Sequence, residues 1–174
     1  MKLKNMLCAV ALAVVGVGAY ADDLTQSIAL TPNATVAGWF SAGMGLTHTS
    51  AGSFTDTITF TGATGGSVEG SLITIGSMAS TDIDFTSVSL NGHAYTLTSM
   101  GPVGTAVLMP ADLSGPLVLT VTGIAAPTLA AGTSIAASYS GTLNVSPVPE
   151  PQSAALLLAG LVAVGILKRR RMQG

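Results

Sequence analysis

The chain has almost no basic residues along most of its length. Its 174 residues include six lysines and arginines, and none of these lies between Lys4 and Lys168. This absence excludes P-loop lysines, Schiff-base lysines and arginine clamps from the central region. It also argues against nucleic acid as a partner, because affinity for phosphate backbones comes mostly from cations.

The same region contains seven carboxylates that no lysine or arginine can pair: Asp22, Asp23, Asp56, Glu69, Asp82, Asp84 and Asp112. Any of them that is buried must accept hydrogen bonds from backbone or hydroxyl groups, hold a cation, or stay protonated. The central region is therefore acidic, and its acids need unusual partners if they lie inside the fold.

Cysteine is nearly absent as well. The single cysteine, Cys8, lies in an N-terminal apolar segment. The central region therefore has no disulfides, and packing and backbone hydrogen bonds must stabilise it.

Three signals follow one another at the C-terminal end. A Pro-rich linker, residues 146–152, contains Val148, Pro149, Glu150 and Pro151. An uncharged segment, residues 153–167, follows, and then a basic tail, residues 168–174, with the cluster Lys168, Arg169, Arg170 and Arg171. The order resembles the PEP-CTERM sorting signal, and this resemblance implies that an exosortase, a membrane protein that removes such tails, is a partner.

The uncharged segment is short for a membrane span. Its apolar part, residues 154–167, would rise only ~21 Å as a helix, against a hydrocarbon core of about 30 Å. Flanking residues extend the helix, and Lys168 and Arg169 can snorkel to the headgroups. We expect a transmembrane helix over 153–167 with the basic cluster in the cytoplasm and everything before Pro147 outside. The alternative is a plain C-terminal anchor.

The N-terminal end agrees with this topology. Lys2 and Lys4 precede a short apolar run, and the small residues Ala19 and Ala21 form a cleavage signal. We expect a signal peptide over residues 1–21, removed by signal peptidase, and an exported domain over residues 22–145.

Alternation of apolar and polar residues predicts strands in the exported domain. In residues 54–61 Phe54, Asp56, Ile58 and Phe60 share one face, and we expect a loop over 61–66 and a strand over 71–75. Asn91-Gly92 predicts a type I′ turn in a hairpin over 83–98, pairing Leu90 with His93 and Val88 with Tyr95.

Further strands are expected over 105–109 and 116–122, around a turn with Pro110, Ser114 and Gly115. The last, residues 133–145, should point Ile135, Ala137, Tyr139, Leu143 and Val145 inward. Residues 24–30 and 36–40 are weaker strand candidates.

Seven or eight short strands predict an all-β fold, an antiparallel β-sandwich of immunoglobulin-like or jelly-roll type, with a partly closed barrel as the alternative. The segment from Ser53 to Phe60 also resembles the motif that names the FxDxF family of PEP-CTERM proteins. Phe54 and Asp56 match that motif, while Ile58 stands where the pattern has phenylalanine. The resemblance implies a small exported β domain without an established activity.

Asp56 is the first candidate site residue, because alternation places it among apolar neighbours. It is expected to cap backbone N–H groups or threonine hydroxyls, and a cation site is the alternative. Asp82 and Asp84 share a strand face and are weak candidates for Ca²⁺, with Asp112 as a further ligand; a solvated edge is the commoner meaning.

The two histidines, His48 and His93, are not spaced as metal ligands are. His93 should be exposed to water, because it follows the turn at the tip of the hairpin. Trp39 and Phe40 are expected to be buried; an exposed Trp39 would instead stack on a sugar ring. The pattern indicates no cofactor, no metal and no catalytic residue.

These features predict a non-enzymatic exported protein, anchored transiently in the inner membrane with its β domain outside. An exosortase would then cut it near Val148 to Pro151, and it would end at the cell surface or in extracellular polysaccharide matrix. Two alternatives remain: a carbohydrate- or Ca²⁺-binding adhesin-like module that uses Trp39 and the acids, and a secreted hydrolase.

Overall fold

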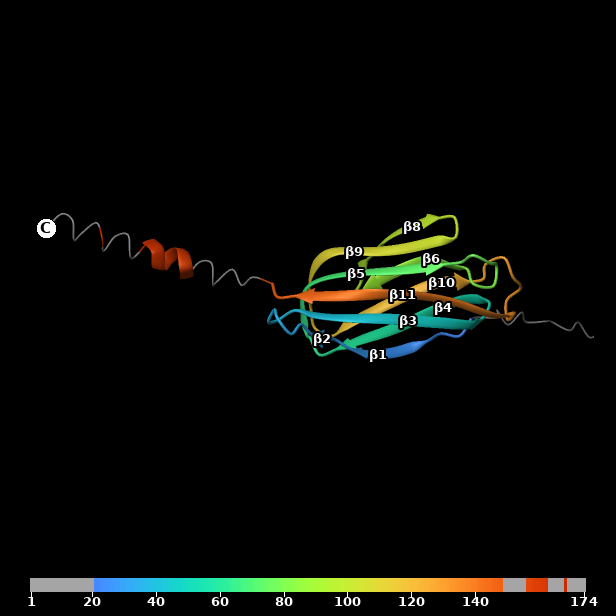
Figure 1. The fold of residues 1–174 in the computed structure, drawn as a ribbon, viewed down its shortest axis with the longest axis horizontal. Coiled ribbons are helices and arrows are strands. Elements are labelled where there is room, and N and C mark those ends of the chain that lie inside the picture. Colours follow the sequence, from blue (N-terminus) through green and yellow to red (C-terminus); the bar gives the residue numbers. More distant parts are fainter. Residues whose placement is uncertain (1–20, 149–155, 163–167, 169–174) are drawn as a thin grey trace, which may run out of the picture.

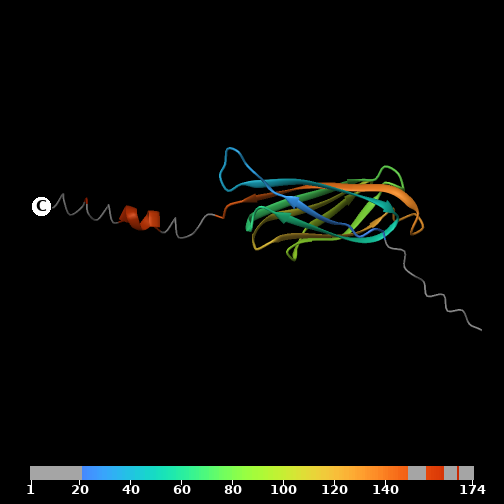
Figure 2. The same cartoon turned by 90° about the horizontal axis from the view of Figure 1, so that it is seen from below.

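The computed structural model describes residues 21–148, 156–162 and 168 of the chain (Figure 1). Residues 21–148 form strands arranged in two sheets. The expected all-β fold is confirmed for this part of the chain. Figure 2 shows the two sheets as facing layers.

One sheet has five strands in the spatial order β1-β4-β10-β6-β7. Its strands are β1 (Thr25–Ala29), β4 (Gly52–Thr61), β10 (Leu117–Ala125), β6 (Ile83–Leu90) and β7 (His93–Ala94). All neighbours are antiparallel except β1 and β4, which pair in parallel. The sequence predicted a purely antiparallel sheet, and the parallel pairing of β1 with β4 departs from that prediction.

The other sheet has six strands in the order β2-β3-β11-β5-β9-β8. Its strands are β2 (Thr31–Pro32), β3 (Phe40–Ser50), β11 (Ser134–Ser146), β5 (Gly65–Ile75), β9 (Val103–Ser114) and β8 (Thr96–Met100). The last long strand of the chain, β11, lies inside this sheet between β3 and β5.

The chain repeatedly passes from one sheet to the other. Ala51 alone separates β3 from β4, and Tyr95 alone separates β7 from β8. Such crossings bring the inward faces of the two sheets together, and their buried side chains form one core. Strands that are consecutive in the sequence, such as β3 and β4, thus lie in opposite sheets. The choice between an immunoglobulin-like and a jelly-roll arrangement stays a prediction.

The clearest sequence patterns are confirmed. In β4 every second residue from Phe54 to Phe60 is buried. In β11 the predicted inward residues are all buried: Ile135, Ala137, Tyr139, Leu143 and Val145. Asn91 and Gly92 both have positive φ, 49° and 82°, and Leu90 pairs with His93. The predicted edge strand near residues 24–30 exists as β1.

Four details of the strand predictions were wrong. The paired part of the hairpin ends at Ala94, because Tyr95 leads the chain into the other sheet, although the Tyr95 N–H still donates to the Val88 carbonyl oxygen. His93 is exposed, as predicted. The predicted strand over 36–40 is a loop, and β3 begins only at Phe40. β5 starts at Gly65, inside the predicted loop. Pro110 lies within β9, so the turn to β10 contains only Gly115 and Pro116.

The predicted signal peptide and most of the predicted membrane segment lie outside the described residues. Residues 156–162 are helical and exposed. Among the described residues there is no helix with the length and apolar character needed to cross a bilayer.

Candidate functional site

Three polar side chains meet in the centre of the core. Asp56 projects inward from β4, while His48 and Tyr139 project from β3 and β11 of the opposite sheet. Tyr139 Oη donates to Asp56 Oδ2 over 2.6 Å, and His48 Nε2 lies 3.1 Å from the same oxygen. His48 and Asp56 have 0% exposure and Tyr139 has 2%. We call these three residues the internal cluster.

The other polar atoms of the cluster bind the segment that precedes β1. The Leu24 N–H donates to Asp56 Oδ1 over 2.8 Å. His48 Nδ1 lies 3.2 Å from the carbonyl oxygen of Asp22. Asp56 thus has three partners in the fold, and its carboxylate needs no lysine or arginine.

The geometry sets the charge of the His48–Asp56 pair. A carbonyl oxygen only accepts, so His48 Nδ1 holds a hydrogen. One further hydrogen lies between Nε2 and Asp56 Oδ2, whichever atom holds it. The pair has no net charge, which lowers the cost of placing a carboxylate among apolar side chains.

Aromatic rings enclose the cluster. The rings of His48 and Phe54 stack with centroids 4.0 Å apart, and Phe85 meets Tyr139 edge-on at 5.6 Å. Burial, the hydrogen bond to Asp56 and the charge of Asp56 together raise the pKa of the Tyr139 hydroxyl far above its usual value. The side chains of the cluster are therefore enclosed within the core in this structure.

The segment before β1 is also fixed from outside the cluster. The Asp22 carboxylate accepts from Thr49 Oγ1 over 2.9 Å, and Asp23 Oδ1 accepts from the Thr55 N–H over 2.7 Å. Ala21 is 2% exposed, and its N–H donates to the Ser53 carbonyl oxygen. Ala21, predicted as the last residue of the signal peptide, thus packs as part of the domain.

The prediction for Asp56 was right about the kind of partner and incomplete about its identity. Asp56 accepts from a backbone N–H and a hydroxyl, as expected, but the hydroxyl is that of a tyrosine and the third partner is His48. Alternation over Ala42, Met44, Leu46 and His48 was the signal that would have placed His48 inside. The glycines at positions 43 and 45 obscured that signal.

The other acidic candidates stay apart. Asp84 is exposed on β6, and Asp82 precedes that strand; partial burial and then the charge of Asp84 raise the pKa of Asp82. Asp112 lies on β9 opposite Ser67. Within the described residues no three acids, histidines or cysteines gather as a metal site would need.

Trp39 is exposed, contrary to the prediction of burial. Its exposed fraction is 45%, since Trp39 lies in the loop just before β3, while the next residue, Phe40, is partly buried against the core. The indole borders a hollow of about 70 Å³ together with Glu69, Pro110 and Asn144. The structure therefore places an aromatic ring and a carboxylate together at the surface.

Of the predicted sorting residues Val148 to Pro151, the structure describes Val148, which lies two residues after the end of β11. Pro147 and Val148 are exposed directly after Ser146, and Lys168 is exposed in a helical position. Pro149, Glu150, Pro151 and the three arginines at 169–171 lie outside the described residues, as does Ala19.

Comparison with known proteins gives one match. Residues 147–171 match the family model described as the PEP-CTERM protein-sorting motif. No curated protein matches the chain, and no solved structure matches it. The matched residues do not include Phe54, Asp56 or Ile58, so membership of the FxDxF family stays a prediction. The chain contains a PEP-CTERM protein-sorting motif, the signal of an exported protein that an exosortase sorts.

Proposed function

We propose that the chain is a non-enzymatic exported protein whose β-sandwich is held briefly at the inner membrane and then freed by cleavage of its tail. The observation that supports this most is the sorting motif at residues 147–171. The motif begins directly after β11, which ends at Ser146. A cut between Val148 and Pro151 would leave every strand in place.

A non-enzymatic role is supported by the state of the polar groups. The side chains that converge in the core, His48, Asp56 and Tyr139, have almost no exposed surface. A hydrolase needs its nucleophile and base at a cleft that the substrate enters. The released domain would act at the cell surface or in a polysaccharide matrix by binding.

Deletion of the exosortase in the producing cell tests the sorting part. In cells with the enzyme, intact-mass measurement should show a chain that ends near Val148 to Pro151 and leaves the membrane fraction. In the deletion strain the chain should keep its tail and stay with the membrane.

A matched pair of variants refines this test. Glu150→Gln lies in the motif and should reduce cutting, while Glu69→Gln, on β5, should be cut like the unchanged chain. Full-length protein in the membrane of cells that contain the exosortase would contradict the proposal.

A second function is favoured by one observation, the exposure of Trp39 beside Glu69 and Asn144. An exposed indole next to hydrogen-bonding side chains is suited to saccharide binding. The Ca²⁺-binding version has less support, because the acids do not gather among the described residues.

A further inference from the structure

Hydrogen bonds connect the two ends of the loop that presents Trp39. Asn33 Oδ1 accepts from the N–H groups of Thr35 and Val36 over 2.9 and 3.0 Å and from Thr35 Oγ1 over 2.8 Å. The Asn33 N–H in turn donates to the Trp39 carbonyl oxygen over 2.8 Å. These bonds close the loop at both ends, so a ligand that contacted the indole would need to order little of the loop's backbone.

A β-bulge brings the partners of Trp39 together. The pairing of β5 with β9 shifts between Val68 and Gly70, where the two residues Met109 and Pro110 lie opposite the single residue Glu69. Proline has no N–H to give to the ladder, so a bulge tolerates it. The bulge places Pro110 beside Glu69, and both border the hollow next to Trp39.

The polar groups in this hollow suit a ligand with hydroxyls. Asn144 Nδ2 donates to Glu69 Oε1 over 3.3 Å across neighbouring strands, which orients the carboxylate. Ser67 and Ser146 complete the border. The carboxylate and amide can accept from and donate to sugar hydroxyls, while the indole covers the C–H face of the ring.

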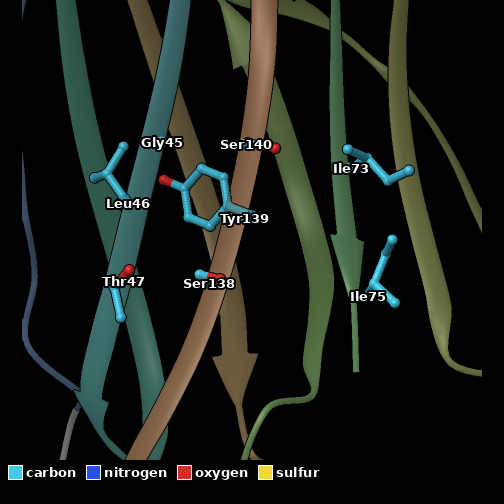
Figure 3. Close-up of a pocket in the computed structure, with 8 residues that line it drawn as sticks. All are labelled: Gly45, Leu46, Thr47, Ile73, Ile75, Ser138, Tyr139 and Ser140. Carbon is cyan, nitrogen blue, oxygen red and sulfur yellow. The ribbon is translucent and has the colours of Figure 1, made fainter. Parts of the chain in front are cut away.

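The hollow continues along the outer face of the six-stranded sheet. A second hollow of about 340 Å³ shares Glu69, Pro110 and Asn144 with the first and extends over Ser71, Thr142 and Met109. A third, of about 490 Å³, follows on β11 and β5, where Ser140 lies opposite Ile73 (Figure 3). We call the three together the outer groove.

Small residues form the floor of the outer groove, and larger apolar ones line its side. Gly45, Ser138 and Ser140 carry small side chains or none, while Ile73 and Ile75 project beside them at 41% and 62% exposure. Residues 67 to 75 of β5 alone span ~26 Å. A groove of this length and shape suits an extended chain of alternating polar and apolar surface.

The charge of the outer groove indicates which kind of polymer it can bind. The outer groove contains one ionisable side chain, Glu69, and the sequence has no lysine or arginine between Lys4 and Lys168. An acidic polysaccharide would meet only repulsion. A neutral one meets hydroxyls, an amide and an indole.

We propose that the outer groove binds a neutral polysaccharide chain, with Trp39 stacking on one sugar ring at the end near Pro147. This inference deepens the second candidate function and rests on export to a place where such a polymer occurs. It does not depend on cleavage of the tail, so the two proposals fail separately.

The sequence makes the test specific, because Trp39 is the only tryptophan in the chain. The full-length protein is placed in nanodiscs of phosphatidylethanolamine and phosphatidylglycerol, and iodide quenching of its fluorescence is measured. Without sugar, iodide should quench Trp39. Cellohexaose or chitohexaose should shift the emission and protect the indole in a saturable way, while alginate should do neither.

Calorimetry with variants locates the site. Trp39→Ala should weaken binding of the protecting oligosaccharide by at least roughly tenfold, and Glu69→Gln and Asn144→Ala by smaller factors. Met78→Ala is the control, because Met78 is 67% exposed in the loop between β5 and β6 and borders none of the three hollows.

Three results would overturn the proposal. The first is no protection by either neutral hexasaccharide at millimolar concentration. The second is protection from iodide before any sugar is added, which would assign Trp39, with its exposed neighbour Val36, to the bilayer. The third is protection that grows with protein concentration alone, which would assign the surface to a second copy of the chain.

Discussion

Two carboxylates of this domain, Asp56 and Glu69, each lie near an aromatic side chain, and their surroundings are otherwise opposite. Asp56 is fully buried, with Tyr139, His48 and the Leu24 N–H as partners. Glu69 is exposed in the outer groove, with Asn144 as its partner and Trp39 nearby. The same chemical groups thus hold the fold together in one place and remain available to a ligand in the other.

The difference comes from enclosure rather than from residue type. Both oxygens of Asp56 accept from donors in the fold, so removing the carboxylate leaves three buried or partly buried donors without an acceptor. Glu69 keeps water as an alternative partner, so its removal costs the fold little. Loss of stability should therefore follow changes at the internal cluster, and loss of binding should follow changes at the outer groove.

The largest effect should come from Asp56→Ala. The variant leaves His48, the Tyr139 hydroxyl and the Leu24 N–H buried without an acceptor, and should lower the free energy of unfolding by about 3–5 kcal/mol. Urea denaturation followed by circular dichroism measures it. Asp84→Ala, at an exposed acid, is the control and should stay within about 0.5 kcal/mol. A small effect of Asp56→Ala would mean that the cluster is not the support we describe.

Substitution of glycine should have opposite effects on the inner and outer faces of the six-stranded sheet. A Cβ added at Gly141 would overlap the Ser71 carbonyl oxygen and the Leu72 side chain, whereas one added at Gly43 meets nothing within 4 Å. Gly141→Ala should therefore cost about 1–3 kcal/mol. Gly43→Ala should stabilise by up to about 0.5–1 kcal/mol, because alanine loses less backbone freedom on folding. Equal effects on the urea midpoint would show that the outer face of the sheet at Gly43 is packed as tightly as the core.

The two buried tyrosines predict loss of stability in alkali. Burial raises the pKa of Tyr95 to about 12, and burial with the Asp56 contacts raises that of Tyr139 as well. Above the unfolded pKa near 10 the unfolded chain releases these protons and the folded chain keeps them. The tyrosines should therefore leave the free energy of unfolding unchanged below pH 10. Above pH 10 they should lower it by about 1.4 kcal/mol per pH unit for each tyrosine.

Titration of the variants checks this assignment. Residues 21–148 contain no lysine, arginine or cysteine, so the tyrosines are the groups of that region that titrate near pH 10. Tyr95→Phe should remove about half of the alkaline slope. At pH 7 it should cost little, since the Tyr95 hydroxyl is buried without a partner in the described structure. An unchanged slope in Tyr95→Phe would show that this hydroxyl is solvated in the folded chain.

The sequence predicted the strands best where alternation was uninterrupted. In β4 and β11 the inward-facing residues other than Asp56 and Gly141 are apolar, so period and burial agree. In β3 the glycines at 43 and 45 face outward and contribute no side chain, which hid the inward row that ends at His48. The internal cluster therefore could not be assembled, although Asp56 was recognised as unusual.

Apart from the hairpin at Asn91-Gly92, local sequence patterns could not predict which strands pair with one another. His48 and Asp56 are eight residues apart and lie in different sheets, because Ala51 carries the chain across the sandwich. Pro110 and Glu69 meet only through a bulge between β5 and β9. Sequence signals of turns locate reversals of direction, but they do not say whether the next strand continues in the same sheet or enters the opposite one.

The smallest effect on stability should come from Trp39→Ala, and this variant tests the comparison most directly. The indole is nearly half exposed and belongs to no buried cluster, so its removal should change the free energy of unfolding by no more than about 0.5 kcal/mol. An ordinary buried aromatic would cost about 3–5 kcal/mol on the same change. A measured loss in that higher range would show that Trp39 packs against the domain, and the outer groove would then lose the residue proposed to bind sugar. A small loss together with abolished binding of the neutral hexasaccharide would separate the two regions cleanly, because it removes a ligand contact from a fold whose internal support is untouched.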